Sequence, residues 1–233
     1  MTVPAVADRL GRTGRPRIVL SCQGLRVTAG RTVLVDDLCF DVRAGEIYGL
    51  VGAEGAGKST VLRAVSGLVS ADAGTVVLGG HRLDRLDVSA RTRLVGHAVG
   101  DAVILPSATV IENLSFWARV LGRDRVGHVV PAVRLGEYAD VAVDRCSAAV
   151  RRALGLAVAL LPDPPLLVLD EPAGGLDRAD TDWLHATVRR LREYGTAVLY
   201  AGRRADDVLS VCDRIGVLDH GRLVGDRADL PAA

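Results

Sequence analysis

The sequence predicts an α/β fold in which a parallel-sheet core carries an antiparallel β-subdomain and an inserted helical subdomain. Short apolar runs alternate with segments of helical periodicity, an order typical of parallel sheets. Two hairpin patterns, one early and one late, indicate an antiparallel layer beside that sheet. Lys58 and Asp170 are much further apart in the sequence than a simple α/β crossover requires, and the residues between them are mostly helical by pattern. These observations predict the helical insertion.

The first half of the chain contains mainly strands. Alternating apolar and polar residues predict two strands, and a short apolar run predicts a third, buried strand. Helical spacing follows a glycine-rich stretch, and Gly79-Gly80 then marks the turn of a hairpin. The predicted strands are 18–27, 34–42, 47–51, 75–78 and 81–83, and the predicted helix is 59–68.

The second half alternates helices and strands. Residues 109–159 are mostly helical by pattern, including 110–121 and 148–161. The remaining predicted helices are 180–194 and 205–211, and the predicted strands are 166–169, 197–200, 214–218 and 222–224. The predicted domain spans 17–226, with its helical subdomain at about 101–160. Residues 1–16 are predicted to be a disordered arm and 227–233 a C-terminal tail.

Composition excludes several classes of protein. The net charge is +1, so no basic excess indicates nucleic acid as a partner. Apolar residues make up 49% of the 233 residues, enough for a sizeable core. A bilayer span needs about 20 consecutive apolar residues, and none is expected here. The arginine-rich start of the sequence lacks the apolar segment of a secretory signal.

A phosphate-binding loop is the strongest motif. The run Gly-Ala-Glu-Gly-Ala-Gly-Lys-Ser matches G-x-x-x-x-G-K-[ST] between a predicted buried strand and a predicted helix. Lys58 is the only lysine among 29 basic residues, which indicates a position that arginine cannot fill. Backbone N–H groups and the helix N-terminus would bind phosphates, and Lys58 would reach the β- and γ-phosphates. The predicted nucleotide contacts here are Gly52, Gly55, Ala56, Gly57, Lys58, Ser59 and Thr60.

Two carboxylates follow the predicted strand at 166–169. Asp170 would hold Mg²⁺ together with the Ser59 hydroxyl, and Glu171 would act as general base on the attacking water. An apolar run that ends in Asp-Glu is a weak signal alone, because acidic residues often end strands. Together with a phosphate-binding loop it becomes a strong one.

These motifs resemble those of ATP-binding-cassette (ABC) ATPases. Leu169-Asp170-Glu171-Pro172 and Gly175-Leu176-Asp177 resemble the magnesium-binding strand and the D-loop of that family, and the similarity extends over about 18–224. The resemblance implies a P-loop NTPase core and places Asp177 at the nucleotide. It also implies dimeric cassettes that enclose two ATP molecules and act on a membrane-spanning subunit.

Two departures from the family pattern concern the base and the metal. The aromatic residue that normally stacks on adenine falls at Ala29, and Tyr48, near the phosphate-binding loop, is expected to lie in the core. The Q-loop glutamine falls at Gly100, which has no side chain to replace it. His97 or Asp101 could substitute, and the alternative is a solvated loop.

Two further departures concern the γ-phosphate. The signature motif falls at 146–150, where Ser147 is kept but both glycines are alanine, which hinders close backbone approach. Chance similarity at a helix start is the alternative. The switch histidine falls at Arg203, which is assigned a catalytic role beside Glu171; Arg203 and Arg204 as a solvated pair is the alternative.

The resemblance therefore predicts an ATP-binding subunit with weakened hydrolysis, an ABC-type ATPase at the cytoplasmic face of the membrane. It would bind Mg²⁺ and ATP, a membrane subunit and a second cassette, which could be identical or different. The Thr-Val-x-Glu-Asn-Leu segment at 109–114 resembles exporter subunits and favours export. A fully active homodimeric transport ATPase and a soluble non-transport ABC protein are the alternatives.

Overall fold

The computed structural model describes residues 17–98 and 104–228. The predicted N-terminal arm at 1–16 lies outside the described residues, as do Gly100 and Asp101 from the predicted nucleotide site. The last strand ends at Ala228, so it continues past residue 226 into the segment predicted as a tail.

The larger sheet forms the centre of the molecule. It contains β3 (Ile47–Val51), β6 (Val95–Ala98), β7 (Leu166–Asp170), β8 (Ala197–Gly202), β9 (Arg214–Asp219) and β10 (Arg222–Ala228), in the order β10-β9-β3-β8-β7-β6. All neighbours pair in parallel except β9 and β10. β3, β7 and β8 are buried along almost their whole length, because both faces of the sheet are covered. The C-terminal ends of β3 and β7 lie at one edge, where α/β proteins commonly bind ligands.

A second, antiparallel sheet lies beside the first. It contains β1 (Ile18–Ala29), β2 (Thr32–Arg43), β4 (Ala73–Leu78) and the short β5 (His81–Arg82), in the order β2-β1-β4-β5. β1 and β2 are the longest strands described, at 12 residues each, and they form a hairpin around Gly30. This sheet is the predicted antiparallel layer.

The late hairpin belongs to the other sheet, so its predicted place in the antiparallel layer is wrong. β9 pairs with β10 on one side and, in parallel, with β3 on the other. The first three residues of β9 are consequently buried. A hairpin pattern shows that two strands pair with each other, but carries no information about which strand pairs with the outer side.

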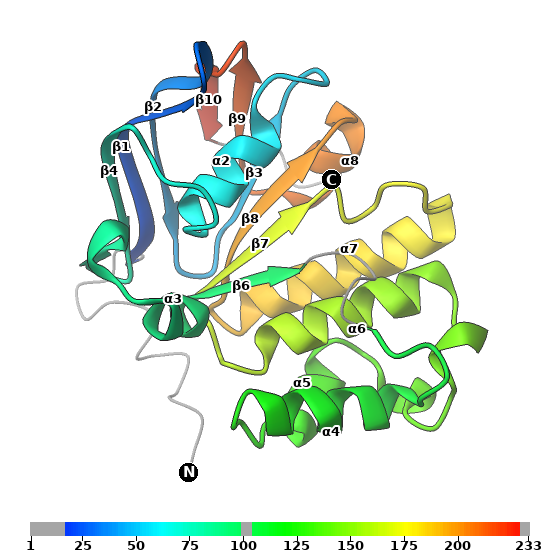
Figure 1. Ribbon diagram of the computed structural model, residues 1–233. Coiled ribbons are helices and arrows are strands. Elements are labelled where there is room, and N and C mark those ends of the chain that lie inside the picture. The colour runs from blue at the N-terminus through cyan, green and yellow to red at the C-terminus, as the bar shows by residue number, and fades with distance from the viewer. Residues whose placement is uncertain (1–16, 99–103, 229–233) are drawn as a thin grey trace.

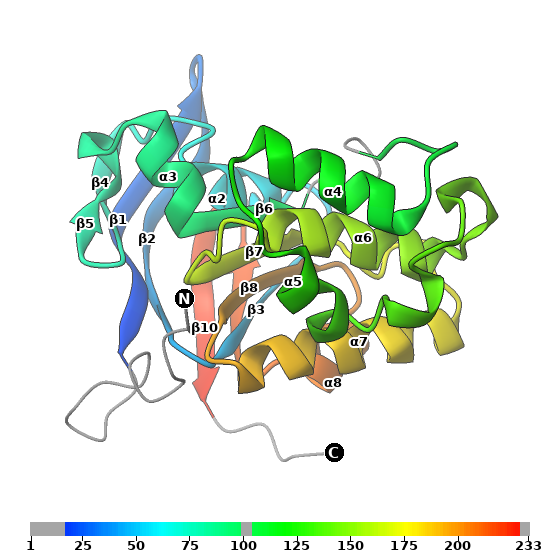
Figure 2. The same ribbon diagram turned by 90° about the horizontal axis from the view of Figure 1, so that it is seen from below.

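Helices cover both faces of the larger sheet (Figure 1). They are α2 (Lys58–Val65), α3 (Val88–Leu94), α4 (Val110–Val120), α5 (Val126–Ala132), α6 (Ala148–Leu160), α7 (Arg178–Glu193) and α8 (Ala205–Val211). Short 3₁₀ turns occur at Leu83–Arg85, Gly136–Tyr138 and Val143–Arg145. α2 lies between the two sheets, whereas α6, α7 and α8 pack on the opposite face. Figure 2 shows α4 and α5 grouped with α6 away from the antiparallel sheet.

Two hydrophobic cores follow from this arrangement. Alternate residues of β7 point to opposite faces of the sheet, so Val168 packs with Leu62 of α2. Leu167 and Leu169 pack instead with α6 and α7. The side-chain alternation of β7 therefore determines which of its residues face the phosphate-binding loop.

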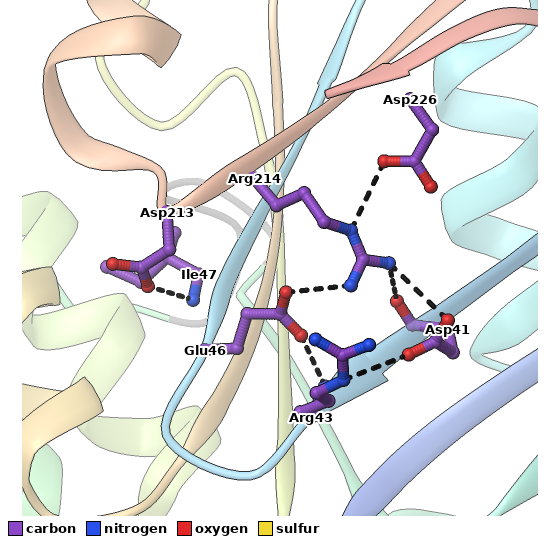
Figure 3. A network of polar contacts seen from close by, with 7 residues as sticks. All are labelled: Asp41, Arg43, Glu46, Ile47, Asp213, Arg214 and Asp226. Carbon is purple, nitrogen blue, oxygen red and sulfur yellow. Dashed lines mark hydrogen bonds and ion pairs between the residues drawn. The ribbon is translucent and has the colours of Figure 1, made fainter. Parts of the chain in front are cut away.

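One arginine joins the two sheets (Figure 3). Arg214 opens β9, and its side chain is 7% exposed. Its guanidinium pairs with Glu46 (3.0 Å) before β3, Asp226 (3.2 Å) on β10 and Asp41 (3.6 Å) on β2. It also lies over the ring of Tyr48, 4.6 Å from the ring centroid. The buried charge is thus neutralised by carboxylates from both sheets.

α3 and β6 are absent from the sequence prediction. α3 has no buried residue, so it lacks the apolar periodicity that reveals an amphipathic helix. β6 has four residues, too few for a pattern. The predicted helix at 59–68 ends earlier, at Val65, because Gly67 adopts a φ of 70° and Leu68 N–H bonds back to the Arg63 carbonyl. Among the described helices, none has the length and apolar character that crossing a membrane requires.

Candidate functional site

The phosphate-binding loop connects β3 to α2, as the sequence predicts. Gly57 caps α2 with a φ of 102°, a conformation that side chains disfavour. A Cβ at Gly57 would lie 2.7 Å from the Leu34 carbonyl oxygen, and one at Gly52 would lie 2.2 Å from that of Leu218. Glycine is therefore required at both positions, and the loop backbone stays open at the N-terminus of α2.

Lys58 lies inside this loop. Its side chain is buried, and Nζ donates to the carbonyl oxygens of Gly52 at 2.6 Å and Ala53 at 2.8 Å. An ammonium group has three donors, so one remains for a further acceptor. Among the described residues no carboxylate forms an ion pair with Lys58, and a phosphate oxygen is the acceptor that its position favours.

Asp170 faces the same side of the sheet as α2. It follows Val168 by two residues on β7, and Val168 packs against α2. Its Oδ1 atom is buried and has no hydrogen-bond partner among the described residues. Ser59, in the first turn of α2, is half-buried. A carboxylate and a hydroxyl are hard oxygen donors, and the unpartnered carboxylate oxygen fits Mg²⁺ or a water bound to it.

Glu171 occupies a strained position after β7. Its φ is 47°, in the left-handed region, and its N–H donates to the Ala201 carbonyl at 2.9 Å. The Arg203 Nε donates to the Glu171 carboxylate at 2.8 Å. This hydrogen bond raises the pKa of Arg203. The predicted partners Glu171 and Arg203 are therefore in direct contact.

Glu54 is a site residue that the sequence prediction missed. It lies in the phosphate-binding loop, and its Oε2 is 3.6 Å from the Arg203 Nη1. Arg203 thus bridges the loop to Glu171. Glu54 occupies a variable position of the loop motif, so no local signal in the sequence indicates this contact.

Ser147 and Asp177 each cap a helix. The Ser147 hydroxyl accepts the Val150 N–H at 3.3 Å, and the Asp177 carboxylate accepts the Asp180 N–H at 2.8 Å. α6, which begins after Ser147, packs on the opposite sheet face from α2. Within the described residues, the structure gives Ser147 no contact with the phosphate-binding loop.

A polar cleft of about 570 Å³ lies beside Glu171, lined by Asp177, Arg203 and residues of α7 and α8. Its wall contains His185, which is buried between Tyr200 (3.1 Å) and Ser210 (3.1 Å). Ser210 donates to the Asp207 carbonyl, so its oxygen accepts from His185 Nδ1–H, and Nε2 accepts from the Tyr200 hydroxyl. Burial lowers the pKa of His185, consistent with this neutral form.

The departure at Ala29 can also be placed in the structure, as can Tyr48 and His97, the described residues weighed as substitutes. Ala29 is exposed where β1 meets its turn, on the hairpin whose other strand places the Leu34 carbonyl beside Gly57. Tyr48 is fully buried and stacks on Phe40 with ring centroids 5.3 Å apart, so it is a core residue, as expected. His97 lies on β6, where burial lowers its pKa.

The comparisons with known proteins agree with these motifs. A family model described as "ABC transporter" matches residues 35–174. The linearmycin resistance ATP-binding protein LnrL of Bacillus subtilis is 31% identical over 220 residues, covering 91% of this chain and 70% of the relative. A Nod factor export ATP-binding protein I of Ralstonia nicotianae is 36% identical over 212 residues, covering 88% and 66%.

Solved structures share the fold. A nucleotide-free ATP-binding cassette from an ABC transporter superposes with a TM-score of 0.81 at 19% identity, covering 91% of this chain and 92% of that one. CbiO1 of Clostridium perfringens, part of the ABC transporter complex cbiONQ, gives 0.82 at 21% identity, covering 90% and 88%.

Proposed function

The chain belongs to the ABC transporter family of ATP-binding subunits, which are ATPases, and on that basis we propose that it binds Mg·ATP to drive transport with weakened hydrolysis. The carrying observation is the buried Lys58 in an intact phosphate-binding loop, on the same sheet face as Asp170. The chemistry is phosphoryl transfer, in which positioning and charge stabilisation do most of the work. Bound Mg²⁺ would neutralise phosphate charge.

Each motif residue has a specific part in this proposal. Loop N–H groups and Lys58 bind the phosphates, while Ser59 and Asp170 hold the metal. Glu171 takes the proton of the attacking water. Asp177, at the head of α7 and lining the cleft beside Glu171, contributes at the nucleotide.

Arg203 is the main reason to expect weakened hydrolysis. A permanently charged guanidinium holds the Glu171 carboxylate in an ion pair, so its oxygens are engaged by Arg203 instead of being free to orient an attacking water. Alanines at the start of α6 add Cβ atoms where the family pattern has glycine backbone. The alternative is a fully active homodimeric ATPase, which the retention of Glu171 favours.

The relatives support a membrane partner and a direction of transport. Relatives described as Nod factor export ATP-binding proteins favour export, and cbiO1 is part of a transporter complex. We infer a membrane-spanning partner subunit, a second cassette, and a location at the cytoplasmic face of the membrane. Ser147 would act on nucleotide held by that second cassette.

Lys58→Ala tests nucleotide binding. It removes the charge-assisted contact to phosphate, so calorimetric titration with Mg·ATP should show binding abolished or severely weakened. Arg119→Ala, at an exposed position of α4, is the control and should bind like the parent. Equal affinity in parent and Lys58→Ala would contradict the proposed function.

A further inference from the structure

Two buried polar atoms near the metal-binding strand lack partners. They are His97 Nδ1 on β6 and Asp170 Oδ1 on β7, neither of which has a hydrogen bond within the described residues. A buried polar atom without a partner destabilises the folded state. Two such atoms on adjacent strands leave hydrogen-bonding capacity that a water or a bound ligand can satisfy.

Strand geometry places both side chains on one face. β6 and β7 pair in parallel, with His97 opposite Val168. Val95 and Val168 belong to the core around α2, whereas a Cβ at Gly96 would point at Ala159 of α6. By alternation His97, two residues after Val95, shares the α2 face with Asp170.

His97 lies opposite Val168, so Asp170 is its diagonal neighbour two residues further along β7 on the same face. Both atoms nevertheless remain without a direct hydrogen bond to each other. A water between the strands would satisfy both, donating one hydrogen to the imidazole nitrogen and one to the carboxylate. The water shell of a magnesium ion is a ready source, because Mg²⁺ keeps several waters when bound in proteins.

We propose that His97 links the hydration shell of the bound metal to β6, a role that Gly100 cannot perform. This inference rests on the proposed binding of Mg·ATP. The imidazole nitrogen acts as a hydrogen-bond acceptor for a metal-bound water that also contacts Asp170. His97 is then a positioning residue, holding the metal shell against the sheet without binding the metal itself.

The test uses Mn²⁺ in place of Mg²⁺ and an ATP analogue with an imido bridge between the β- and γ-phosphates. Mn²⁺ affinity is measured from the free-ion electron paramagnetic resonance signal, and nucleotide affinity is measured separately in EDTA. His97→Phe keeps a ring but removes both nitrogens. It should weaken Mn²⁺ binding roughly two- to tenfold, the value of one hydrogen bond, and leave nucleotide affinity in EDTA unchanged.

Two further variants make the result specific. His97→Gln restores a polar side chain and should recover most of the Mn²⁺ affinity. His128→Phe, at an exposed position of α5, should match the parent. Unchanged Mn²⁺ affinity in His97→Phe would overturn the inference, as would an equal loss of nucleotide affinity in EDTA, which indicates a structural role. A parent that binds no nucleotide would contradict the proposed function, and the inference with it.

Discussion

Arg203 shows how one residue can change the chemistry of a site. Its Nε lies 2.8 Å from the Glu171 carboxylate, and its Nη1 lies 3.6 Å from Glu54. Arginine stays protonated at any working pH, so it cannot relay a proton as histidine can. Glu171 therefore faces a fixed cation, and the Arg203 side chain joins Glu171 to the phosphate-binding loop.

Ala29 occupies the position at which the family pattern places an aromatic residue against the nucleotide base. Exposed on the hairpin beside the phosphate-binding loop, it offers no aromatic surface, so we predict that ATP and GTP bind within a few-fold of each other. Ala29→Tyr should tighten ATP binding by about 1 kcal/mol, or about five-fold, because one stacking contact is added. Both dissociation constants can be measured by calorimetry.

Val33→Tyr is the control for this substitution. Val33 is a 40% exposed residue of the same hairpin, at a position that the family pattern does not use for stacking. It should leave both affinities unchanged. A strong preference of the parent for ATP, unaltered by Ala29→Tyr, would mean that another ring already covers the base.

For individual residues, the sequence predicts those that belong to a continuous motif. Lys58 and Glu171 are identified because motif spacing encodes their positions, and the structure brings Glu171 into contact with Arg203. The contact between Glu54 and Arg203 joins segments far apart in the chain, and no periodicity encodes it. The unpartnered nitrogen of His97 likewise emerges only when β6 and β7 pair.

Among the elements, β9 connects the two sheets through Arg214. Asp213, just before this strand, accepts the Ile47 N–H at 2.8 Å (Figure 3). Burial raises the pKa of Glu46, while Arg214 acts in the opposite direction. The Arg43 N–H and Arg214 therefore offset part of the cost of burying this carboxylate at the junction.

Arg214→Met should destabilise the protein by about 3 kcal/mol. The substitution preserves much of the side-chain volume but leaves Glu46 buried without its cation. A buried charge without a partner strongly destabilises the folded state. The free energy of unfolding from urea titration measures the loss. Adding Glu46→Met should recover part of it, because a well-packed apolar pair can replace a buried ion pair.

The exposed pair of Arg82 and Asp84 supplies the control. Both side chains are well exposed and the ions lie 2.8 Å apart, so solvent screens them. Arg82→Met should leave the urea midpoint unchanged. If Arg214→Met behaves in the same way, the junction does not depend on this charge network.

Elements were predictable where burial leaves a pattern. α8 (Ala205–Val211) and β3 (Ile47–Val51) match the predicted bounds, since their apolar spacing is clear. The exposed α3 shows no apolar periodicity, and the partner of β9 lies outside its own hairpin. Local sequence therefore predicts what an element is better than it predicts which element lies beside it.

For the whole molecule, the important fact is that the nucleotide motifs are divided between two faces. Lys58 begins α2 and Asp170 faces that helix, whereas Ser147 precedes a helix that packs on the opposite face of the sheet. One chain therefore presents a phosphate-binding loop and, elsewhere, a capped helix N-terminus suited to an anion. The proposed second cassette would bring the two kinds of surface together, and turnover would then depend on the pair.

Turnover should be slow when this chain is purified alone, because Arg203 holds Glu171 in an ion pair and alanines replace glycines at the start of α6. Glu171→Gln removes the general base and should lower the remaining activity by about 10²–10⁴-fold. It should also stabilise an ATP-bound dimer, since bound nucleotide is no longer consumed. Phosphate release and light scattering measure the two effects.

Arg203→His tests whether turnover is slow because of the ion pair with Glu171 or because the chain lacks a second cassette. It replaces the fixed cation with the residue that the family pattern has at this position, and should raise turnover while leaving Mg·ATP affinity unchanged, because Lys58 and its loop are untouched. A parent chain that alone turns over near the enzyme median of about 10 s⁻¹ would contradict weakened hydrolysis and favour the fully active homodimer. If Arg203→His and parent are equally slow, the ion pair is not the cause, and the altered start of α6 becomes the remaining explanation.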